Sequence, residues 1–162
     1  STPFFMAADR ADLPYMKLLL ELGADPFIPN VDGCTPLMVA AGLGSRAPEE
    51  EAGSLEECLA VVKFMVGLGS DVNVVDANGE TAMHGAAYKN APLVAQYLHE
   101  QGADIEIWNR NNNSGWTPLL IAEGYRPGNF KTSFATVDTI TEIMLSQGVK
   151  PPTEPRPKPT NY

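Results

Sequence analysis

The side chains best suited to chemistry are two histidines and two cysteines. His84 lies in the apolar, alanine-rich run TAMHGAAYKN (residues 81–90), and His99 follows fifteen residues later. No cysteine or carboxylate stands at metal-site spacing from either histidine, so the sequence predicts no metal site. No Ser–His–Asp pattern is readable, and we expect no catalytic residues. Cys34 and Cys58 are too few for a disulfide framework and lack zinc spacing, which indicates packed thiols.

Two polar segments have the composition of ligand loops but not their spacing. The segment APEEEAGSLEE (47–57) contains five glutamates, yet it lacks the Asp-rich alternation and central glycine of a calcium loop. Its end fits a capping box, with Ser54 capping the helix that follows and Glu57 reaching back. The segment GYRPGNF (124–130) contains glycines without a phosphate-cradling pattern. We therefore expect a solvated acidic loop followed by a helix, and no cofactor.

Composition narrows the classes of partner. The 162 residues are 44% hydrophobic, which is enough for one ordinary core. Eleven basic against twenty acidic residues give a net charge of −9 and a pI near 4.6. This charge repels phosphate backbones, so we expect no nucleic-acid partner. No apolar run reaches the roughly 18 residues of a membrane helix, and no signal peptide is visible. We expect a soluble protein, cytoplasmic or, in a bacterium, periplasmic or secreted.

The run that contains His84 is one of four related strings. They begin at Thr2 (TPFFMAADRA), Thr35 (TPLMVAAGLG), Thr81 and Thr117 (TPLLIAEGYR). Each string is followed by an apolar run that closes on a glycine: Gly23, Gly69, Gly102 and Gly148. The spans from threonine to glycine are 21, 34, 21 and 31 residues, so two units carry insertions. The gaps from glycine to the next threonine are 12, 12 and 15 residues, so the last junction is longer.

Each unit has the pattern of a helix, a turn, a second helix and an extended hairpin. Threonine followed by proline starts the first helix, because the fixed φ of proline suits a first turn. Apolar periodicity predicts second helices near residues 13–22, 55–67, 92–101 and 137–147. The closing glycines suit left-handed helix ends. The clusters VDG, DANG and NNNSG (31–33, 76–79 and 111–115) are typical of tight turns.

At these positions the chain resembles the ankyrin repeat family across residues 2–149. The resemblance rests on ETAMHGAA, GWTPLLIA, the Gly-Ala-Asp closings, and Gly33, Thr35, Pro36, Leu37, Ala40 and Ala41. It implies an all-α ankyrin repeat solenoid of stacked helix-turn-helix units joined by short β-hairpin turns. The last unit, with its enlarged GYRPGNFKTSF segment, resembles those that end certain bacterial ankyrin proteins.

The resemblance also implies a domain organisation. The ankyrin domain spans residues 1–149, with units at about 2–29, 30–75, 76–108 and 109–149. Insertions occupy 44–57 and 125–135. Residues 150–162 form a proline-rich tail that we expect to be extended and mobile. The opening helices are as apolar as those of an internal unit, and we expect upstream repeats of the same chain to cover them.

The family places His84 at the histidine of its TPLH motif, where the ring bonds backbone groups of an adjacent repeat. The same resemblance gives structural roles to Thr35, Thr81, Thr117, Gly23, Gly69 and Gly102. It implies that the chain is not an enzyme but a module that binds a protein or peptide in a concave groove. The acidic charge favours a partner with a basic patch. The alternatives are a structural spacer or regulatory domain of a larger polypeptide, or, less favoured, part of an enzyme.

The expected groove consists of the hairpin tips and the exposed sides of the first helices. Its candidate partner-binding residues are Asp32, Asn78, Glu80, Tyr88, Lys89, Trp108, Trp116 and Tyr125. Exposed Trp and Tyr are typical interface anchors. For Trp108 and Trp116 the alternative is that they pack on each other or on the elongated turn between them.

Overall fold

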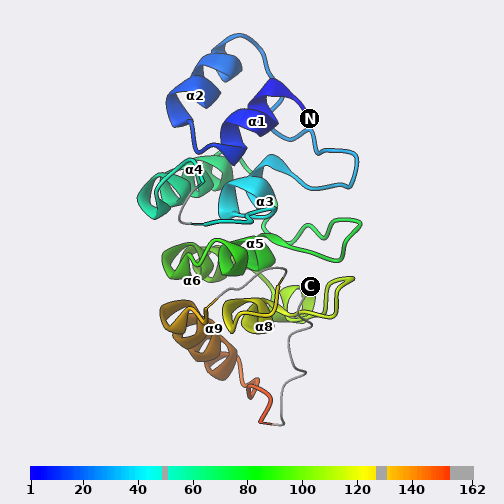
Figure 1. The fold of residues 1–162 in the computed structure, drawn as a ribbon. Coiled ribbons are helices and arrows are strands. Elements are labelled where there is room, and N and C mark those ends of the chain that lie inside the picture. Colours follow the sequence, from blue (N-terminus) through cyan, green and yellow to red (C-terminus); the bar gives the residue numbers. More distant parts are fainter. Residues whose placement is uncertain (49–50, 127–130, 154–162) are drawn as a thin grey trace.

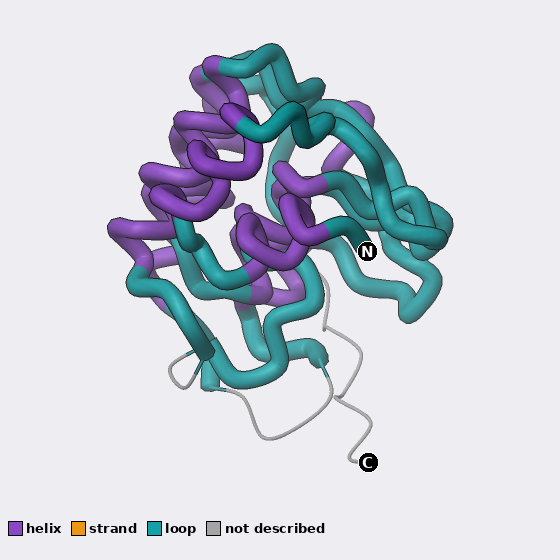
Figure 2. The backbone as a smooth tube through the Cα atoms, turned by 90° about the horizontal axis from the view of Figure 1, so that it is seen from above, coloured by secondary structure: helices purple, strands orange, loops and turns teal. Residues whose placement is uncertain are grey.

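The computed structural model describes residues 1–48, 51–126 and 131–153, and its helices form two stacked rows (Figures 1 and 2). The inner row contains α1 (Pro3–Asp9), α3 (Pro36–Ala41), α5 (Ala82–Tyr88) and α8 (Pro118–Ala122). The outer row contains α2 (Leu13–Glu21), α4 (Leu55–Gly67), α6 (Pro92–Glu100) and α9 (Phe134–Ser146). Consecutive helices of each row contact one another. Four helix pairs are thus stacked in chain order, which confirms the all-α repeat architecture predicted from the sequence.

The helix starts follow from the residues that precede them. The threonine hydroxyls of Thr2, Thr35 and Thr117 each accept the backbone N–H three residues on, at 3.1, 3.3 and 3.3 Å. These bonds satisfy donors that the helix itself leaves unpaired. The capping box of α4 is confirmed, since Ser54 and Glu57 exchange side-chain to backbone bonds of 3.1 Å.

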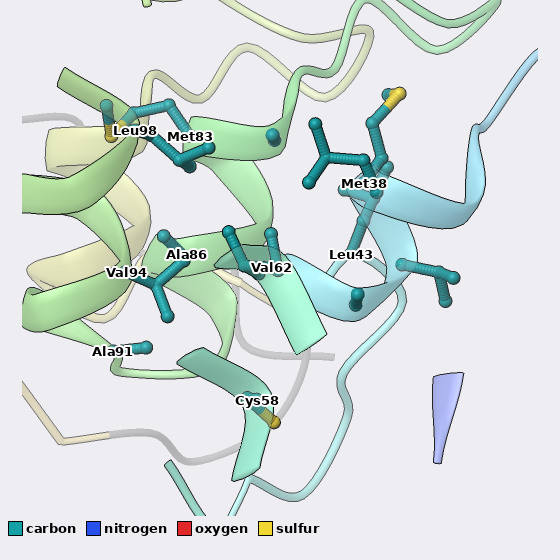
Figure 3. Close-up of a cluster of buried hydrophobic side chains, with 14 of the residues drawn as sticks. Met38, Leu43, Cys58, Val62, Met83, Ala86, Ala91, Val94 and Leu98 are labelled. Atoms are coloured by element: carbon teal, nitrogen blue, oxygen red, sulfur yellow. The ribbon is translucent and has the colours of Figure 1, made fainter. Parts of the chain in front are cut away.

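Small residues between neighbouring inner helices set the spacing of the stack. Every residue of α3 is buried, as is α5 up to Ala87. The close-up in Figure 3 shows Val62, Met83 and Val94 among the side chains that fill the space between the rows. A Cβ built on Gly85 would lie only 2.7 Å from the Leu43 nitrogen of the preceding unit. The backbones of neighbouring units therefore touch at this glycine.

The longer junction before the last unit contains a helix that the sequence analysis missed. Residues 105–108 form α7 (Ile105–Trp108), whose start is capped by Asp104 through a 2.9 Å bond to the Glu106 N–H. The extra length of this junction accommodates the additional turn. Its last residue, Trp108, is 2% exposed and belongs to the hydrophobic core.

Candidate binding surface

Three turns that connect the helix pairs share one construction. In each, the side-chain Oδ1 of Asn30, Asp76 or Asn112 accepts the backbone N–H groups two and four residues on, at 2.8–3.0 Å. A glycine follows three residues after the Asn or Asp, with φ of 78°, 74° and 84° in turn. Such φ values are costly for residues with a Cβ. No strand forms in the described residues, so these side chains and glycines hold the turns.

The three turns are joined into one surface by backbone hydrogen bonds. The N–H of Ala77 donates to the Asp32 carbonyl at 2.8 Å, and the N–H of Asn113 donates to the Asn78 carbonyl at 2.9 Å. Figure 2 shows the loops gathered along one side of the helix rows. We call residues 30–34, 76–80 and 112–116 the turn row. Asp32 and Asn78 are exposed on it, and Glu80 is half-buried.

The turn row carries a negative field. Burial, and after it the charges of Asp76, Glu80, Asp9 and Asp32, raise the pKa of the Cys34 thiol to about 12. Four carboxylates from three successive units thus act on one buried thiol. A thiol with so high a pKa stays protonated and is a poor nucleophile at neutral pH. Cys34 is therefore a packed thiol near four acidic side chains, of which Asp9 and Asp32 are exposed and Asp76 is buried.

Glu80 connects two neighbouring turns through a tyrosine. The Tyr88 hydroxyl hydrogen-bonds the Glu80 carboxyl, and the Asn112 amide nitrogen donates to the Tyr88 oxygen at 3.2 Å. Burial is the main reason that the pKa of Glu80 rises to about 7, and the charge of Asp76 adds to it. Burial also raises the pKa of Tyr88, so its phenol stays neutral. At neutral pH, the protonated and the ionised forms of Glu80 are therefore both populated.

The aromatic candidates beside the turn row are accessible in part. Trp116 is half-buried, and its backbone N–H belongs to the turn held by Asn112. Tyr125 is half-buried just after α8, and Tyr88 is half-buried at the end of α5. The structure therefore brings Asp32, Asn78, Glu80, Tyr88 and Trp116 to one side of the stack.

Comparison with known proteins assigns this arrangement to a family. The family model described as ankyrin repeats (3 copies) matches residues 52–132. The chain belongs to the ankyrin repeat family. It is also 38% identical over 110 residues to neurogenic locus notch homolog protein 1 of Homo sapiens and of Mus musculus. That match covers 63% of this chain and 4% of each relative, so the chain spans a small fraction of the curated relatives it matches.

Two of the candidate partner residues are inaccessible in this ankyrin array, and their assignment to the groove was wrong. Trp108 is 2% exposed because α7 turns it into the core, where it packs internally. Lys89 is 5% exposed, and its Nζ lies 3.7 Å from the Glu51 carboxylate. The inner helices α3 and α5 are also almost wholly buried. The accessible part of the expected groove is therefore the turn row and not the helix faces.

The first insertion explains why Lys89 is buried. Its residue Glu51 accepts the backbone N–H groups of Arg46 and Ala47 at 2.6 and 3.0 Å, and the Ser45 hydroxyl as well. Burial would raise the pKa of Glu51, but these hydrogen bonds and the charge of Lys89 together lower it. Glu51 is thus ionised and pairs with a cation of the next unit. The insertion therefore links two units through the ion pair between Glu51 and Lys89. Its residues 49–50 lie outside the described residues.

The second insertion is anchored at the same end of α5. Arg126 is 5% exposed, and its guanidinium donates to the Tyr88 carbonyl. The N–H of Ser133 donates to the Ala122 carbonyl at 2.9 Å where the insertion returns to α9. Residues 127–130 of this insertion and 154–162 of the predicted tail lie outside the described residues. Both insertions therefore contact the third unit at the end of α5, one at Lys89 and the other at Tyr88.

His84 is a structural side chain by its contacts. Its Nδ1 accepts the Thr81 N–H at 3.1 Å, so the ring proton resides on Nε2, which donates to the Arg110 carbonyl at 3.1 Å. The ring is 0% exposed. Burial lowers the pKa of His84 to about 4, although hydrogen bonds to the backbone of Arg110 and Trp116 oppose this. A neutral histidine thereby joins the third unit to the chain entering the fourth.

The closing glycines have the backbone geometry expected of helix ends. Gly23, Gly69 and Gly102 have φ of 92°, 102° and 94°.

Within the described residues, no group of three or more His, Cys, Asp or Glu side chains could hold a metal ion. No helix in that part of the chain is long and apolar enough to span a membrane.

Several residues of the surface were missed by the sequence analysis. Asn30, Asp76 and Asn112 build the turns. A signal for these three was present, because each stands five residues before the threonine of its unit and three before a glycine. No such spacing marks Glu51 or Arg126, which contact Lys89 and Tyr88 of the third unit.

Proposed function

We propose that this ankyrin domain is a non-catalytic module whose turn row binds a basic segment of a partner protein. The observation that carries the proposal is the group of carboxylates around Cys34, from Asp9 through Asp32 and Asp76 to Glu80. Ankyrin repeats are protein-interaction modules, and the acidic field supplies the chemistry of the partner. Complementary charge steers encounter and selects among partners more than it raises affinity.

The turn row is suited to a partner because it is rigid and partly apolar. The Asx bonds and the backbone bonds between turns fix the positions of Asp32 and Asn78 before binding, which lowers the entropy lost on association. Trp116 offers a half-buried aromatic surface beside them. An extended peptide with alternating basic and apolar side chains would meet both features.

Binding should be measured calorimetrically against a panel of lysine- and arginine-rich peptides. The control panel has the same sequences with serine in place of each basic residue. We expect binding to the basic panel only, with an affinity that falls as salt concentration rises. Asp32→Asn should weaken binding about two- to fivefold, the range for one exposed charge pair, and Trp116→Ala should weaken it further.

Asp138→Asn provides the matched control, since Asp138 is an exposed aspartate on the outer helix α9. It should leave binding unchanged. Equal binding of the serine panel, or equal losses from Asp32→Asn and Asp138→Asn, would contradict a basic partner on the turn row. A folded array that binds neither panel would favour the structural-spacer alternative.

A further inference from the structure

The second turn of the turn row contains an asparagine that is followed by a glycine. Asn78–Gly79 is the single Asn-Gly pair in the sequence, and the corresponding residues are Asp32 in the first turn and Ser114 in the third. Asparagine is one of the thermolabile residues of proteins. Its side-chain amide is lost when the backbone nitrogen of the next residue attacks the amide carbon. A glycine in the next position leaves this approach open, because it has no Cβ.

The side-chain amide of Asn78 is accessible and makes no hydrogen bond within the described part of the chain. Two other asparagines near the turn row differ in this respect. Both side-chain atoms of Asn73 bond backbone groups of the third unit, at 3.1 and 2.8 Å. The Asn113 amide nitrogen donates to the Ala77 carbonyl at 3.2 Å. Of these three, only Asn78 can turn its amide toward the following nitrogen without breaking a side-chain hydrogen bond.

The turn itself holds the attacking nitrogen. The Gly79 N–H donates to the Asp76 carbonyl at 3.1 Å. The Asp76 side chain also accepts the N–H groups of Asn78 and Glu80, at 2.8 and 2.9 Å. The nitrogen attacks after it has lost its proton, so the reaction requires the bond from Gly79 to break. Opening of the turn therefore precedes the chemistry.

We propose that Asn78 is a site of spontaneous deamidation, and that opening of the second turn sets its rate. The Gly79 nitrogen loses its proton to solvent base and forms a bond to the Asn78 Cγ. The side-chain nitrogen leaves as ammonia, and a cyclic succinimide remains. One water molecule then opens the ring at one of its two carbonyls. No change of oxidation state occurs, so the reaction needs only water and base.

The two products affect the turn row differently. One is aspartate, which the first turn already has at this position as Asp32, within the same type of turn. The other is isoaspartate, in which the main chain runs through the former side chain and is one carbon longer. The Asn78 carbonyl, which accepts the Asn113 N–H at 2.9 Å, then becomes part of a free carboxylate. Both products add a negative charge, and isoaspartate also alters the connection to the third turn.

Peptide mass mapping of the full chain after incubation at mildly alkaline pH tests the proposal. Water enriched in heavy oxygen labels only product that forms during the incubation. We expect Asn78 to gain the mass difference between an amide and a carboxyl group first, while Asn73 and Asn113 in the same sample lag behind. Chromatography separates the aspartate and isoaspartate products. Asn78→Gln should lose most of the reaction, because its longer side chain closes the ring less readily.

Two variants of Asp76 test the role of the turn. Asp76→Asn keeps a side-chain acceptor, as in the other two turns, where Asn30 and Asn112 hold this place. Asp76→Ala removes the acceptor of two backbone N–H groups. Both variants lose the carboxylate, so their charges match. Asp76→Ala should react at Asn78 roughly tenfold faster than Asp76→Asn, the change in the open population that follows the loss of one or two net hydrogen bonds.

The wild-type chain supplies the same comparison without a substitution. Unfolded in guanidinium chloride, it should react at Asn78 faster than when folded. Equal rates in the folded and unfolded chain, or in the two Asp76 variants, would show that the turn does not set the rate. The site itself would be refuted by a mass gain at Asn73 or Asn113 that keeps pace with Asn78. Absence of reaction in the folded chain, under conditions that modify the unfolded chain, would refute it as well.

Discussion

At the scale of single residues, His84 and Glu80 make stability depend on pH in opposite directions. The pKa of His84 falls from 6.5 to about 4 on folding, so its contribution to stability is lost as pH falls from about 6.5 to 4. The pKa of Glu80 rises from 4.5 to about 7, so its contribution is lost as pH rises from about 4.5 to 7. Between pH 4.5 and 6.5 the two effects oppose each other.

We therefore predict that Glu80→Gln steepens the loss of stability in acid. Glutamine cannot titrate, so this position no longer opposes the His84 effect, and the thermal midpoint should fall more between pH 6.5 and 4.5 than in the wild type. At pH 8 the variant should be the more stable protein, because it buries no carboxylate beside Asp76. Thermal melts at half-unit pH steps measure both effects. Glu142→Gln, at an exposed site of α9, is the control. Parallel curves for Glu80→Gln and wild type would show that Glu80 does not titrate abnormally.

A second residue-scale prediction concerns the His84 position. His84→Ala should cost on the order of 1–3 kcal/mol, because the Thr81 N–H and the Arg110 carbonyl lose their buried partner. His84→Met should cost less, since Met38 occupies the same position in the second unit, where its sulfur accepts the Thr35 N–H at 3.4 Å. Urea denaturation compares the two variants. Equal losses would mean that Thr81 does not depend on an acceptor there, and a melt shifted by EDTA would indicate a metal.

At the scale of elements, the contact between neighbouring inner helices depends on glycine. A Cβ on Gly42 would lie 2.4 Å from the Lys89 Cβ and 2.5 Å from the Gly85 carbonyl oxygen. Gly102 also has a positive φ, of 94°, but a Cβ there would meet nothing within 4 Å. Both alanine substitutions strain the backbone by about 1 kcal/mol or more.

We predict that Gly42→Ala destabilises the protein by about 1–3 kcal/mol more than Gly102→Ala does, which is the typical cost of overpacking. Chemical denaturation at one pH gives the difference directly. The account of close packing between α3 and α5 fails if the two substitutions cost the same.

The elements themselves were largely predictable from local signals. The Thr-Pro starts, the closing glycines and the apolar periodicity placed the second helices to within about three residues at each end. The helix α7 was not predictable in this way, because four residues in a polar junction have no periodicity to read. The burial of Lys89 depends on Glu51, whose partner stands in another unit behind an insertion. A contact between an insertion and another unit has no characteristic residue spacing, so it cannot be recognised in the sequence.

At the scale of the whole molecule, the stack has two differing surfaces. The outer helices present polar side chains together with exposed apolar ones such as Leu93 and Leu145, while the turn row gathers fixed backbone turns, carboxylates and one accessible tryptophan. A rigid scaffold with its distinctive chemistry on the turns fits the proposal that binding occurs there.

The central claim is tested most directly by amide chemical shifts of the labelled chain titrated with a basic peptide selected from the calorimetric panel. The account predicts that the largest changes fall at residues 30–34, 76–80 and 112–116, with the Trp116 indole signal shifting in proportion to binding. Amides of α4 and α9 should remain nearly unchanged. Changes concentrated on these outer helices, or spread evenly over both surfaces, would contradict the turn row as the binding surface.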